Sequence, residues 1–259
     1  MPFADLPNAR IHYALSGNES SSTFILSNSL GTDFSMWDAQ IADFEKQFRV
    51  LRYDKRGHGQ SFVPPSPYSV SELSSDVLAL ADFLRIDRFY FCGLSIGGMI
   101  GMTLALQSPE RLQKLVVCSS AAKIGTCESW NTRIEMVRTQ GMKEIARTTP
   151  QRWFTPAFIA KSPEVVAAIV RVVESMNPEG YIGGCCAVRD FDAQTRVSQI
   201  RVPTLVISAT QDPAAPPSAG HFLTEHIPGS RYAELNASHI ANIEDAPSFT
   251  AEVLDFLGE

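Results

Sequence analysis

The sequence predicts an α/β fold in which a mostly parallel sheet of eight strands has helices on both faces and an inserted helical cap. Three observations lead to this prediction. Short apolar runs that favour strands alternate with helical stretches along most of the 259 residues. One strand-to-helix junction carries the pattern G-x-S-x-G at 93–97. The stretch 122–190 breaks the alternation, because it contains helical segments and no convincing strand.

The junction around Ser95 is the most informative part of the sequence. An aromatic run over 88–91 predicts a buried strand, and an apolar run over 99–106 predicts a buried helix. So short a turn forces its central residue into a strained backbone conformation, and side chains two positions away would collide with the strand and the helix. Glycines at 93 and 97 meet this requirement. The pattern predicts a nucleophile elbow that holds Ser95 out at its tip, and an ordinary serine in a glycine-rich turn is the alternative.

The elements before this junction begin with a hairpin, whose turn is predicted at 7–8. A turn-rich loop at 28–33 follows the second buried strand. Ser69 and Glu72 have the spacing of a capping box, which predicts the start of a helix that runs to about Leu84. The other predicted elements of this half are strands over 10–15, 23–27 and 48–53 and a helix over 36–46.

Beyond the elbow helix, which Pro109 ends, the alternation implies a mostly parallel sheet. We expect residues 1–121 and 191–259 to form the core domain and residues 122–190 to form a cap over the mouth of the sheet. The predicted elements here are strands over 114–118, 203–209 and 231–235, cap helices over 128–140, 141–149, 163–175 and 178–188, and a final helix over 248–257.

Composition limits the classes of function. A hydrophobic fraction of 44% is ample for a full core, and the net charge of −6 comes without a block of lysine and arginine, so we expect no nucleic-acid binding. The first residues lack the features of a signal peptide, and no run approaches the roughly 20 apolar residues of a membrane span. The five cysteines show no C-x-x-C spacing. These features predict a reduced, cytoplasmic protein with no membrane segment.

An elbow serine needs a base and an acid that orients the base. In this architecture, groups that follow the carboxyl ends of strands converge on the site. Asp212 follows the strand 203–209, and His239 follows the strand 231–235. The order serine, aspartate, histidine is the one found in α/β-hydrolases, so Ser95, Asp212 and His239 are the predicted catalytic residues. The weaker alternatives are His12, His58, His221 and His226 for the base, and Asp190 and Asp192 for the acid.

The predicted reaction also needs two N–H donors for a developing oxyanion. The residue after the nucleophile, Ile96, supplies one through its backbone. The loop after the strand 23–27 supplies the other, and we assign Leu30 because of its place in that loop. An ordinary glycine-containing loop is the alternative.

Several motifs carry a resemblance to a known family. The run 53–61 resembles the D-x-R-G-x-G-x-S signature of the α/β-hydrolase superfamily, and 203–207 before Asp212 and 244–247 after His239 are similar to its later blocks. A closer resemblance is to 3-oxoadipate enol-lactonases. The segments that carry it are 28–33 with Met36 and Trp37, 91–99, and 152–155.

The resemblance implies the α/β-hydrolase fold and hydrolysis of 3-oxoadipate enol-lactone to 3-oxoadipate, in aromatic degradation through the β-ketoadipate pathway. It implies a serine-dependent reaction through an acyl-enzyme, without a metal or an organic cofactor. The alternatives are a carboxylesterase, a C–C bond hydrolase, a cofactor-free perhydrolase, or a ligand receptor that keeps the triad but signals through a partner. A catalytically dead scaffold disagrees with the complete set of predicted catalytic residues. Serine at position 95 disfavours haloalkane dehalogenases, which have aspartate there.

The enol-lactone carries a free carboxylate, so the resemblance predicts a small anionic lactone as the partner and a cation in the site. Residues 122–190 contain nine Lys or Arg and seven Asp or Glu, whereas the rest of the chain contains 13 and 21. Trp130 and Arg133 share a face of a predicted helix. We expect Arg133, Trp130 and Trp153 to bind the substrate. Solvated arginines, and tryptophans that only anchor the cap, are the alternative, and homo-oligomerisation is left open.

Overall fold

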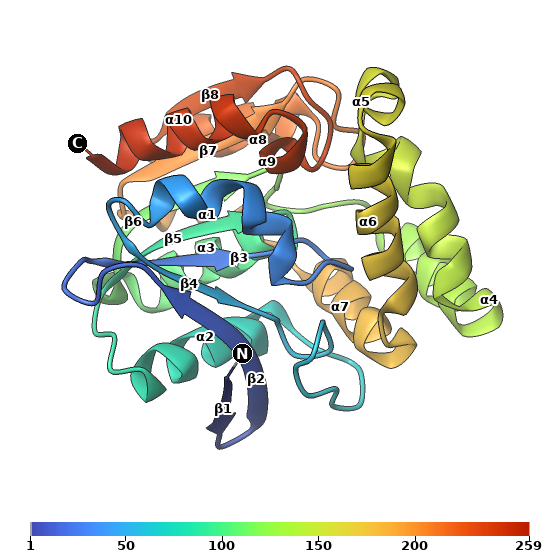
Figure 1. The fold of residues 1–259 in the computed structure, drawn as a ribbon, viewed down its shortest axis with the longest axis horizontal. Coiled ribbons are helices and arrows are strands. Elements are labelled where there is room, and N and C mark those ends of the chain that lie inside the picture. The colour runs from blue at the N-terminus through green and yellow to red at the C-terminus, as the bar shows by residue number, and fades with distance from the viewer. Residues whose placement is uncertain (1, 259) are drawn as a thin grey trace.

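The computed structural model describes residues 2–258, and its core is a sheet of eight strands. The strands are β1 (Phe3–Leu6), β2 (Ala9–Ser16), β3 (Thr23–Ser27), β4 (Arg49–Tyr53), β5 (Phe89–Leu94), β6 (Leu112–Cys118), β7 (Thr204–Ala209) and β8 (Arg231–Leu235). Their order is β1-β2-β4-β3-β5-β6-β7-β8 (Figure 1). β1 pairs antiparallel with β2 and β2 with β4, whereas all other pairs are parallel. The predicted mostly parallel sheet is confirmed.

Five helices cover the two faces of this sheet: α1 (Asp38–Phe44), α2 (Val70–Phe83), α3 (Ile96–Gln107), α8 (Pro217–His226) and α10 (Ala246–Gly258). α1 packs against α10 on one face, and α2 packs against α3 on the other, where α8 also lies against β7 (Figure 1). The capping box at Ser69 is confirmed. Its hydroxyl accepts a hydrogen bond from the Glu72 N–H, and the Glu72 carboxylate accepts one from the Ser69 N–H.

Four short helices lie in the connections of the core: the 3-10 helices η1 (Phe34–Trp37), η2 (Pro109–Arg111) and η3 (Val197–Gln199), and α9 (Ala241–Glu244). The helix predicted over 36–46 is therefore two elements, η1 followed by α1. Asp33 causes the early start, because its side chain accepts a hydrogen bond from the Ser35 N–H and caps η1.

The chain between β6 and β7, residues 119–203, contains no strand and four α-helices that lie beyond one end of the sheet (Figure 1). They are α4 (Cys127–Trp153), α5 (Pro156–Lys161), α6 (Pro163–Ser175) and α7 (Pro178–Asp190). The predicted boundary between helices at 140 and 141 corresponds to a kink at Gly141, which has a φ of 71°. Helix α5 is not among the predicted elements, because it is short. The assignment of 122–190 as a separate cap domain stays a prediction.

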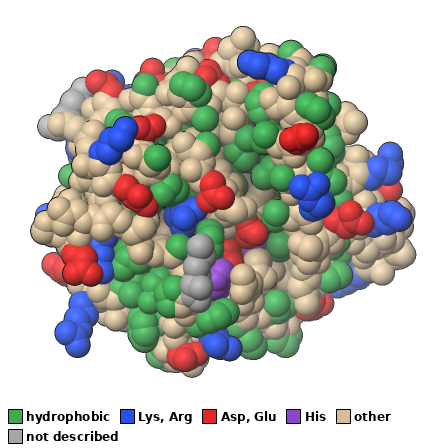
Figure 2. All heavy atoms as spheres, in the orientation of Figure 1, with side chains coloured by type: hydrophobic (Ala, Val, Ile, Leu, Met, Phe, Trp, Pro, Cys, Tyr) green, Lys and Arg blue, Asp and Glu red, His purple; other side chains and the backbone are tan. Residues whose placement is uncertain are grey.

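The surface and the cysteines add three observations. On the face drawn in Figure 2, basic and acidic side chains are interspersed. The five cysteines are free, and all except Cys127 are buried. Within residues 2–258, none of the helices combines the length and the apolar character needed to cross a membrane.

Candidate active site

The turn between β5 and α3 has the strained geometry expected of a nucleophile elbow. Ser95 has a φ of 58°, which non-glycine residues rarely adopt. A Cβ at Gly93 would lie 2.0 Å from the Gly97 carbonyl oxygen, and a Cβ at Gly97 would lie 2.1 Å from the Ser27 carbonyl oxygen. Both contacts are with backbone, which cannot move aside. The predicted steric reason for the two glycines is confirmed.

Ser95 is at the tip of this turn but is covered rather than open to solvent. It is only 8% exposed, because the cavity that it lines is closed over by residues of α4 and α7. Its backbone is tied to β6 and the residues that follow it: the Ser95 N–H donates to the Cys118 carbonyl oxygen at 2.9 Å, and the Ser120 hydroxyl donates to the Ser95 carbonyl oxygen at 2.7 Å. The expectation that the Ser95 side chain is exposed at the tip is wrong. Its burial depends on the inserted helices, which the local pattern around the elbow does not describe.

Asp212 and His239 are in direct contact at the carboxyl ends of β7 and β8. The His239 Nδ1 donates to the Asp212 Oδ2 at 2.8 Å, and both residues are buried. The other Asp212 oxygen accepts from the N–H groups of Ala214 and Ala215 at 2.8 and 3.0 Å. His239 and Ser95 line the same cavity, although no hydrogen bond joins them within the described residues. Asp212 therefore holds one imidazole nitrogen and leaves Nε2 for other chemistry.

The alternative acids and most alternative bases are engaged elsewhere. Asp190 pairs with its neighbour Arg189, and Asp192 pairs with Lys123. The His12 Nδ1 lies 2.8 Å from the buried carboxylate of Asp54. His221 and His226 lie on α8, and His58 is engaged by the loop described below.

The predicted oxyanion donors lie on two loops that meet at Ser95. Ile96 is the first residue of α3, and Leu30 lines the cavity beside Ser95. Within residues 2–258, neither backbone N–H donates a hydrogen bond. The Leu30 loop is a tight turn in which the Thr32 N–H donates to the Ser29 carbonyl oxygen at 3.4 Å. Gly31, which follows Leu30, has a positive φ. Two unpaired donors beside one serine can hold a developing oxyanion.

The cavity in front of Ser95 has a volume of about 340 Å³. All three cap residues predicted to bind substrate line it: Trp130, Arg133 and Trp153. The Trp130 Nε1 donates to the Ile124 carbonyl oxygen at 2.7 Å, which leaves the indole ring as an apolar wall. The Trp153 ring centroid lies 6.4 Å from that of His239. Each tryptophan therefore contacts a neighbouring residue and also lines the cavity.

Two arginines give this cavity a positive charge. The Arg133 Nε donates to the Tyr181 hydroxyl at 2.7 Å, and burial raises the Tyr181 pKa to about 12, so that the hydroxyl stays neutral. Arg152, which the sequence analysis did not select, lines the same cavity, and partial burial and the charge of Arg133 lower its pKa. Within residues 2–258, neither guanidinium forms an ion pair. The signal for Arg152 was its place beside Trp153 in the segment 152–155.

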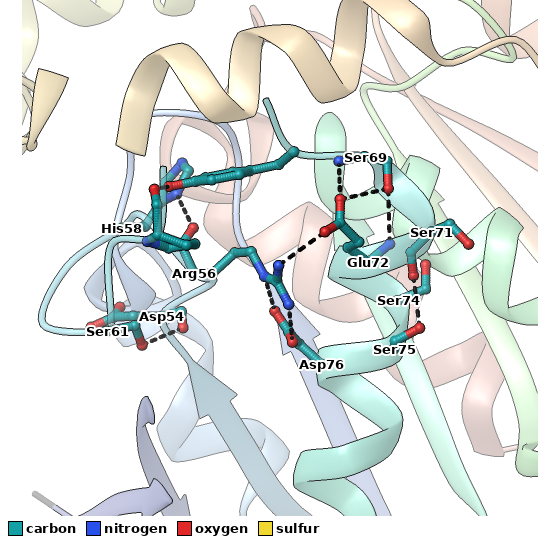
Figure 3. Close-up of polar contacts among 12 residues, drawn as sticks. Asp54, Arg56, His58, Ser61, Ser69, Ser71, Glu72, Ser74, Ser75 and Asp76 are labelled. Atoms are coloured by element: carbon teal, nitrogen blue, oxygen red, sulfur yellow. Dashed lines mark hydrogen bonds and ion pairs between the residues drawn. The ribbon is translucent and has the colours of Figure 1, made fainter. Parts of the chain in front are cut away.

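The loop 54–61 lies under the Leu30 loop and is fixed on both sides. Arg56 reaches Asp76 on α2 through two hydrogen bonds of 2.6 and 2.7 Å, and Glu72 flanks the pair (Figure 3). The His58 Nδ1 donates to the Arg56 carbonyl oxygen at 3.1 Å, and its Nε2 accepts from the Gly31 N–H at 3.2 Å. Because both ring nitrogens are engaged, His58 is not free to act as the base.

No group of three or more histidine, cysteine, aspartate or glutamate side chains is arranged to hold a metal ion in the described chain. The expectation that the reaction needs no metal and no organic cofactor stays a prediction.

Comparisons with known proteins agree with this geometry. Residues 23–143 match a family model described as alpha/beta hydrolase fold. The chain is 43% identical over 243 residues to 3-oxoadipate enol-lactonase 2 of Acinetobacter baylyi, covering 94% of this chain and 91% of that protein. It is 35% identical to 3-oxoadipate enol-lactonase 1 of the same organism, covering 91% and 88%.

Among solved structures, the enol-lactonase from Burkholderia xenovorans superposes with a TM-score of 0.98 at 45% identity, covering both chains completely. Sequence and fold thus lead to the same relatives, over nearly the full length of each. The chain belongs to the 3-oxoadipate enol-lactonase family of α/β hydrolases and is an ester-hydrolysing enzyme.

Proposed function

We propose that this enzyme hydrolyses 3-oxoadipate enol-lactone to 3-oxoadipate through an acyl-enzyme on Ser95. The observation that carries the proposal is the presence of two guanidinium groups, Arg133 and Arg152, in the cavity that Ser95 and His239 line, with no ion pair to either within residues 2–258. A cavity with two cations and a nucleophile suits a substrate that has both a carboxylate and an ester. The printed names of the Acinetobacter and Burkholderia relatives support the same substrate.

The first half of the proposed reaction forms the acyl-enzyme. The Ser95 Oγ attacks the lactone carbonyl carbon while the His239 Nε2 takes its proton, and Asp212 holds the imidazole in the required tautomer. The oxyanion of the tetrahedral intermediate accepts hydrogen bonds from the N–H groups of Leu30 and Ile96. When the intermediate collapses, the ring C–O bond breaks and the leaving oxygen takes the proton back from His239.

The leaving group makes this step hard to reverse. It is an enol, which leaves more readily than an alkoxide, and it tautomerises to a ketone that does not readily close the ring again. A water molecule then attacks the acyl carbon while His239 takes its proton. The second intermediate collapses, Ser95 recovers the proton, and 3-oxoadipate is released. These steps use no electron acceptor and no cofactor.

The arginines bind the substrate carboxylate in this proposal, and the helices α4–α7 act as the cap that carries them. Arg133 and Arg152 lie on α4. The Arg133 Nε donates to the hydroxyl of Tyr181 on α7, which leaves the two terminal nitrogens of that guanidinium for the substrate. A guanidinium holds a carboxylate through two parallel charge-assisted bonds. Trp130 and Trp153 form apolar walls on either side of the carbon skeleton. The place of the reaction in the β-ketoadipate pathway follows from this substrate.

A steady-state assay on enzymatically generated enol-lactone tests the proposal. We expect kcat/KM of at least about 10⁴ M⁻¹ s⁻¹, the lower end for enzymes on their own substrates. p-Nitrophenyl acetate, a small neutral ester, should be a much poorer substrate because it has no carboxylate. Equal kcat/KM values for the two esters would instead favour a carboxylesterase.

A further inference from the structure

A buried lysine lies directly behind the Leu30 loop. Lys55 is 1% exposed and has no carboxylate partner among residues 2–258. Its Nζ donates instead to two backbone carbonyl oxygens, that of Asn28 at 2.8 Å and that of Ser29 at 3.2 Å. Burying an ammonium group without a counter-ion destabilises the folded protein. A residue that is buried at such a cost in stability is a candidate for a functional role.

The Ser29 carbonyl and the Leu30 N–H belong to one peptide unit. A trans peptide is planar, so its C=O and N–H point in opposite directions. A hydrogen-bond donor on the carbonyl side holds the peptide so that its N–H points to the other side of the loop, and Leu30 lines the cavity with Ser95. Donors on a carbonyl oxygen also polarise the peptide and strengthen its N–H as a donor. The Thr32 hydroxyl and the Thr32 N–H also donate to the same oxygen, at 2.9 and 3.4 Å.

The next peptide is fixed from the same side. Gly31 donates its N–H to the His58 Nε2 at 3.2 Å, and the His58 Nδ1 donates to the Arg56 carbonyl oxygen. His58 is 2% exposed, and burial together with the charge of Lys55 holds its pKa well below the usual value. The imidazole is therefore neutral and accepts at Nε2.

The loop that carries both side chains is itself anchored. On one side Asp54 accepts from His12, and on the other Arg56 is paired with Asp76 on α2 (Figure 3). Lys55 lies between these two anchors, and His58 lies two residues beyond Arg56. Contacts to the carbonyls of Asn28 and Ser29 and to the Gly31 N–H thus hold the backbone before and after the Leu30 N–H.

We propose that Lys55 and His58 are positioning residues for the oxyanion hole. Lys55 orients and polarises the Leu30 N–H through the Ser29 carbonyl, and His58 fixes the following peptide through the Gly31 N–H. The inference rests on the proposed function, because the Leu30 N–H matters to catalysis only if the site stabilises an acyl-transfer oxyanion.

The test compares Lys55→Met, Lys55→Gln, Thr32→Val and His58→Leu with the wild type. Lys114→Met is the matched control, because the Lys114 Nζ also donates to a backbone carbonyl, that of Phe256, at 2.7 Å and away from the cavity. The acylation rate constant comes from the p-nitrophenol burst with p-nitrophenyl acetate. Affinity for phenylboronic acid, which forms a tetrahedral adduct with the nucleophilic serine, reports on the oxyanion hole. Circular dichroism measures folding.

Removing an oxyanion donor outright costs about 10²- to 10³-fold in rate, so weakening one should cost less. We expect Lys55→Met to lower the acylation rate constant about 10- to 100-fold and to lower the affinity for phenylboronic acid in parallel. The ester concentration that half-saturates acylation should stay near the wild-type value, because the contact with the oxyanion forms in the transition state. Lys55→Gln should recover part of the loss through a neutral donor. Thr32→Val and His58→Leu should show smaller parallel losses, and Lys114→Met should show none.

A folded Lys55→Met that acylates and binds phenylboronic acid within about twofold of the wild type would overturn the inference. If Lys55→Met does not fold, Thr32→Val tests the inference, because it removes another donor to the Ser29 carbonyl oxygen. Unchanged acylation and unchanged affinity for phenylboronic acid in Thr32→Val would then overturn the inference. A wild-type enzyme that cleaves p-nitrophenyl acetate but not the enol-lactone would contradict the proposed substrate only. A wild type that cleaves neither would overturn both proposals.

Discussion

The His239 Nδ1 lies 2.8 Å from the Asp212 Oδ2, although the two residues are 27 positions apart in the chain. Their strands explain this contact. β7 and β8 are parallel neighbours, with Ala209 opposite Leu235 at their carboxyl ends, so the loops that follow begin side by side. The contact determines which imidazole nitrogen stays available, and it sets the role of each residue in the predictions that follow.

Replacing Ser95 by alanine should reduce hydrolysis of both enol-lactone and p-nitrophenyl acetate to the background rate. The reason is that the Oγ is the proposed nucleophile, while alanine keeps the Cβ and the backbone of the elbow. Circular dichroism and thermal unfolding should show a folded protein. Ser16→Ala removes a buried hydroxyl that has no partner in the described chain, and it should keep full activity. Substantial turnover by Ser95→Ala would mean that the nucleophile is another residue.

Replacing Asp212 by asparagine should lower kcat by up to about 10⁴-fold, as in serine proteases, because the amide offers His239 the wrong hydrogen-bond pattern. Asp190→Asn is the matched control, since among residues 2–258 Asp190 pairs only with its neighbour Arg189. Steady-state kinetics on the enol-lactone separate the two. A severe loss in Asp190→Asn and a mild one in Asp212→Asn would reverse the assignment.

Replacing Arg133 by methionine should lower kcat/KM on the enol-lactone by about one to two powers of ten, because a charge-assisted bond contributes about 1.5–3 kcal/mol. Arg152→Met should act in the same direction. Neither change should affect a small neutral ester, which has no carboxylate.

The control for both arginines is Arg138→Met, which changes an exposed arginine of α4 outside the cavity. Equal losses on the lactone and the neutral ester would indicate a misplaced cap. Unchanged kinetics on both substrates in Arg133→Met or Arg152→Met would show that the arginine replaced in that variant is a solvated charge that does not bind the carboxylate.

Lys55 should make stability depend on pH. Burial lowers its pKa from 10.5 to about 7, and the nearby carboxylates of Asp54 and Asp33 only partly oppose this. Between these pH values the unfolded chain binds the proton that the folded chain has lost, so the free energy of unfolding rises with pH, by up to about 1.4 kcal/mol per unit.

Urea unfolding of wild type and Lys55→Met at pH 6, 8 and 10 measures this effect. The wild-type free energy of unfolding minus that of the variant should increase from pH 6 to pH 10, because the methionine does not titrate. Burial, the larger cause of the low His58 pKa, is present in both proteins, so most of the His58 contribution cancels in the difference. Parallel pH curves would show that Lys55 titrates normally.

Replacing Gly93 by alanine should destabilise the fold by at least about 1–3 kcal/mol, the usual range for forcing extra atoms into a packed interior. The added Cβ would meet the Gly97 carbonyl oxygen at 2.0 Å. Gly258→Ala is the control, because a Cβ there meets no atom within 4 Å. Thermal unfolding of the two variants checks the difference, and similar melting temperatures would contradict the steric account of the elbow.

Local patterns in the sequence predicted most of the fold and the main elements of the candidate site. Apolar patterns located seven of the eight strands, and the hairpin turn predicted at 7–8 implied β1. The glycines around Ser95 identified the elbow, although only the Gly93 contact lies within the turn, since a Cβ at Gly97 would meet Ser27 of β3. Chain order then placed Asp212 and His239 after neighbouring strands. The catalytic roles of these residues, and of Leu30 and Ile96, stay predictions for the experiments above.

Properties that depend on packing between distant segments came only from the tertiary structure. An unbroken helix would place Arg152 about 100° around the axis from Arg133, yet α4 is kinked at Gly141 and both arginines line the cavity. Lys55 lies in a loop whose sequence gives no sign of burial, and its contacts with Asn28 and Ser29 join segments far apart in the chain. Periodicity reports which face of one element is apolar, whereas burial, charge pairing and pKa depend on what the rest of the chain brings against that face.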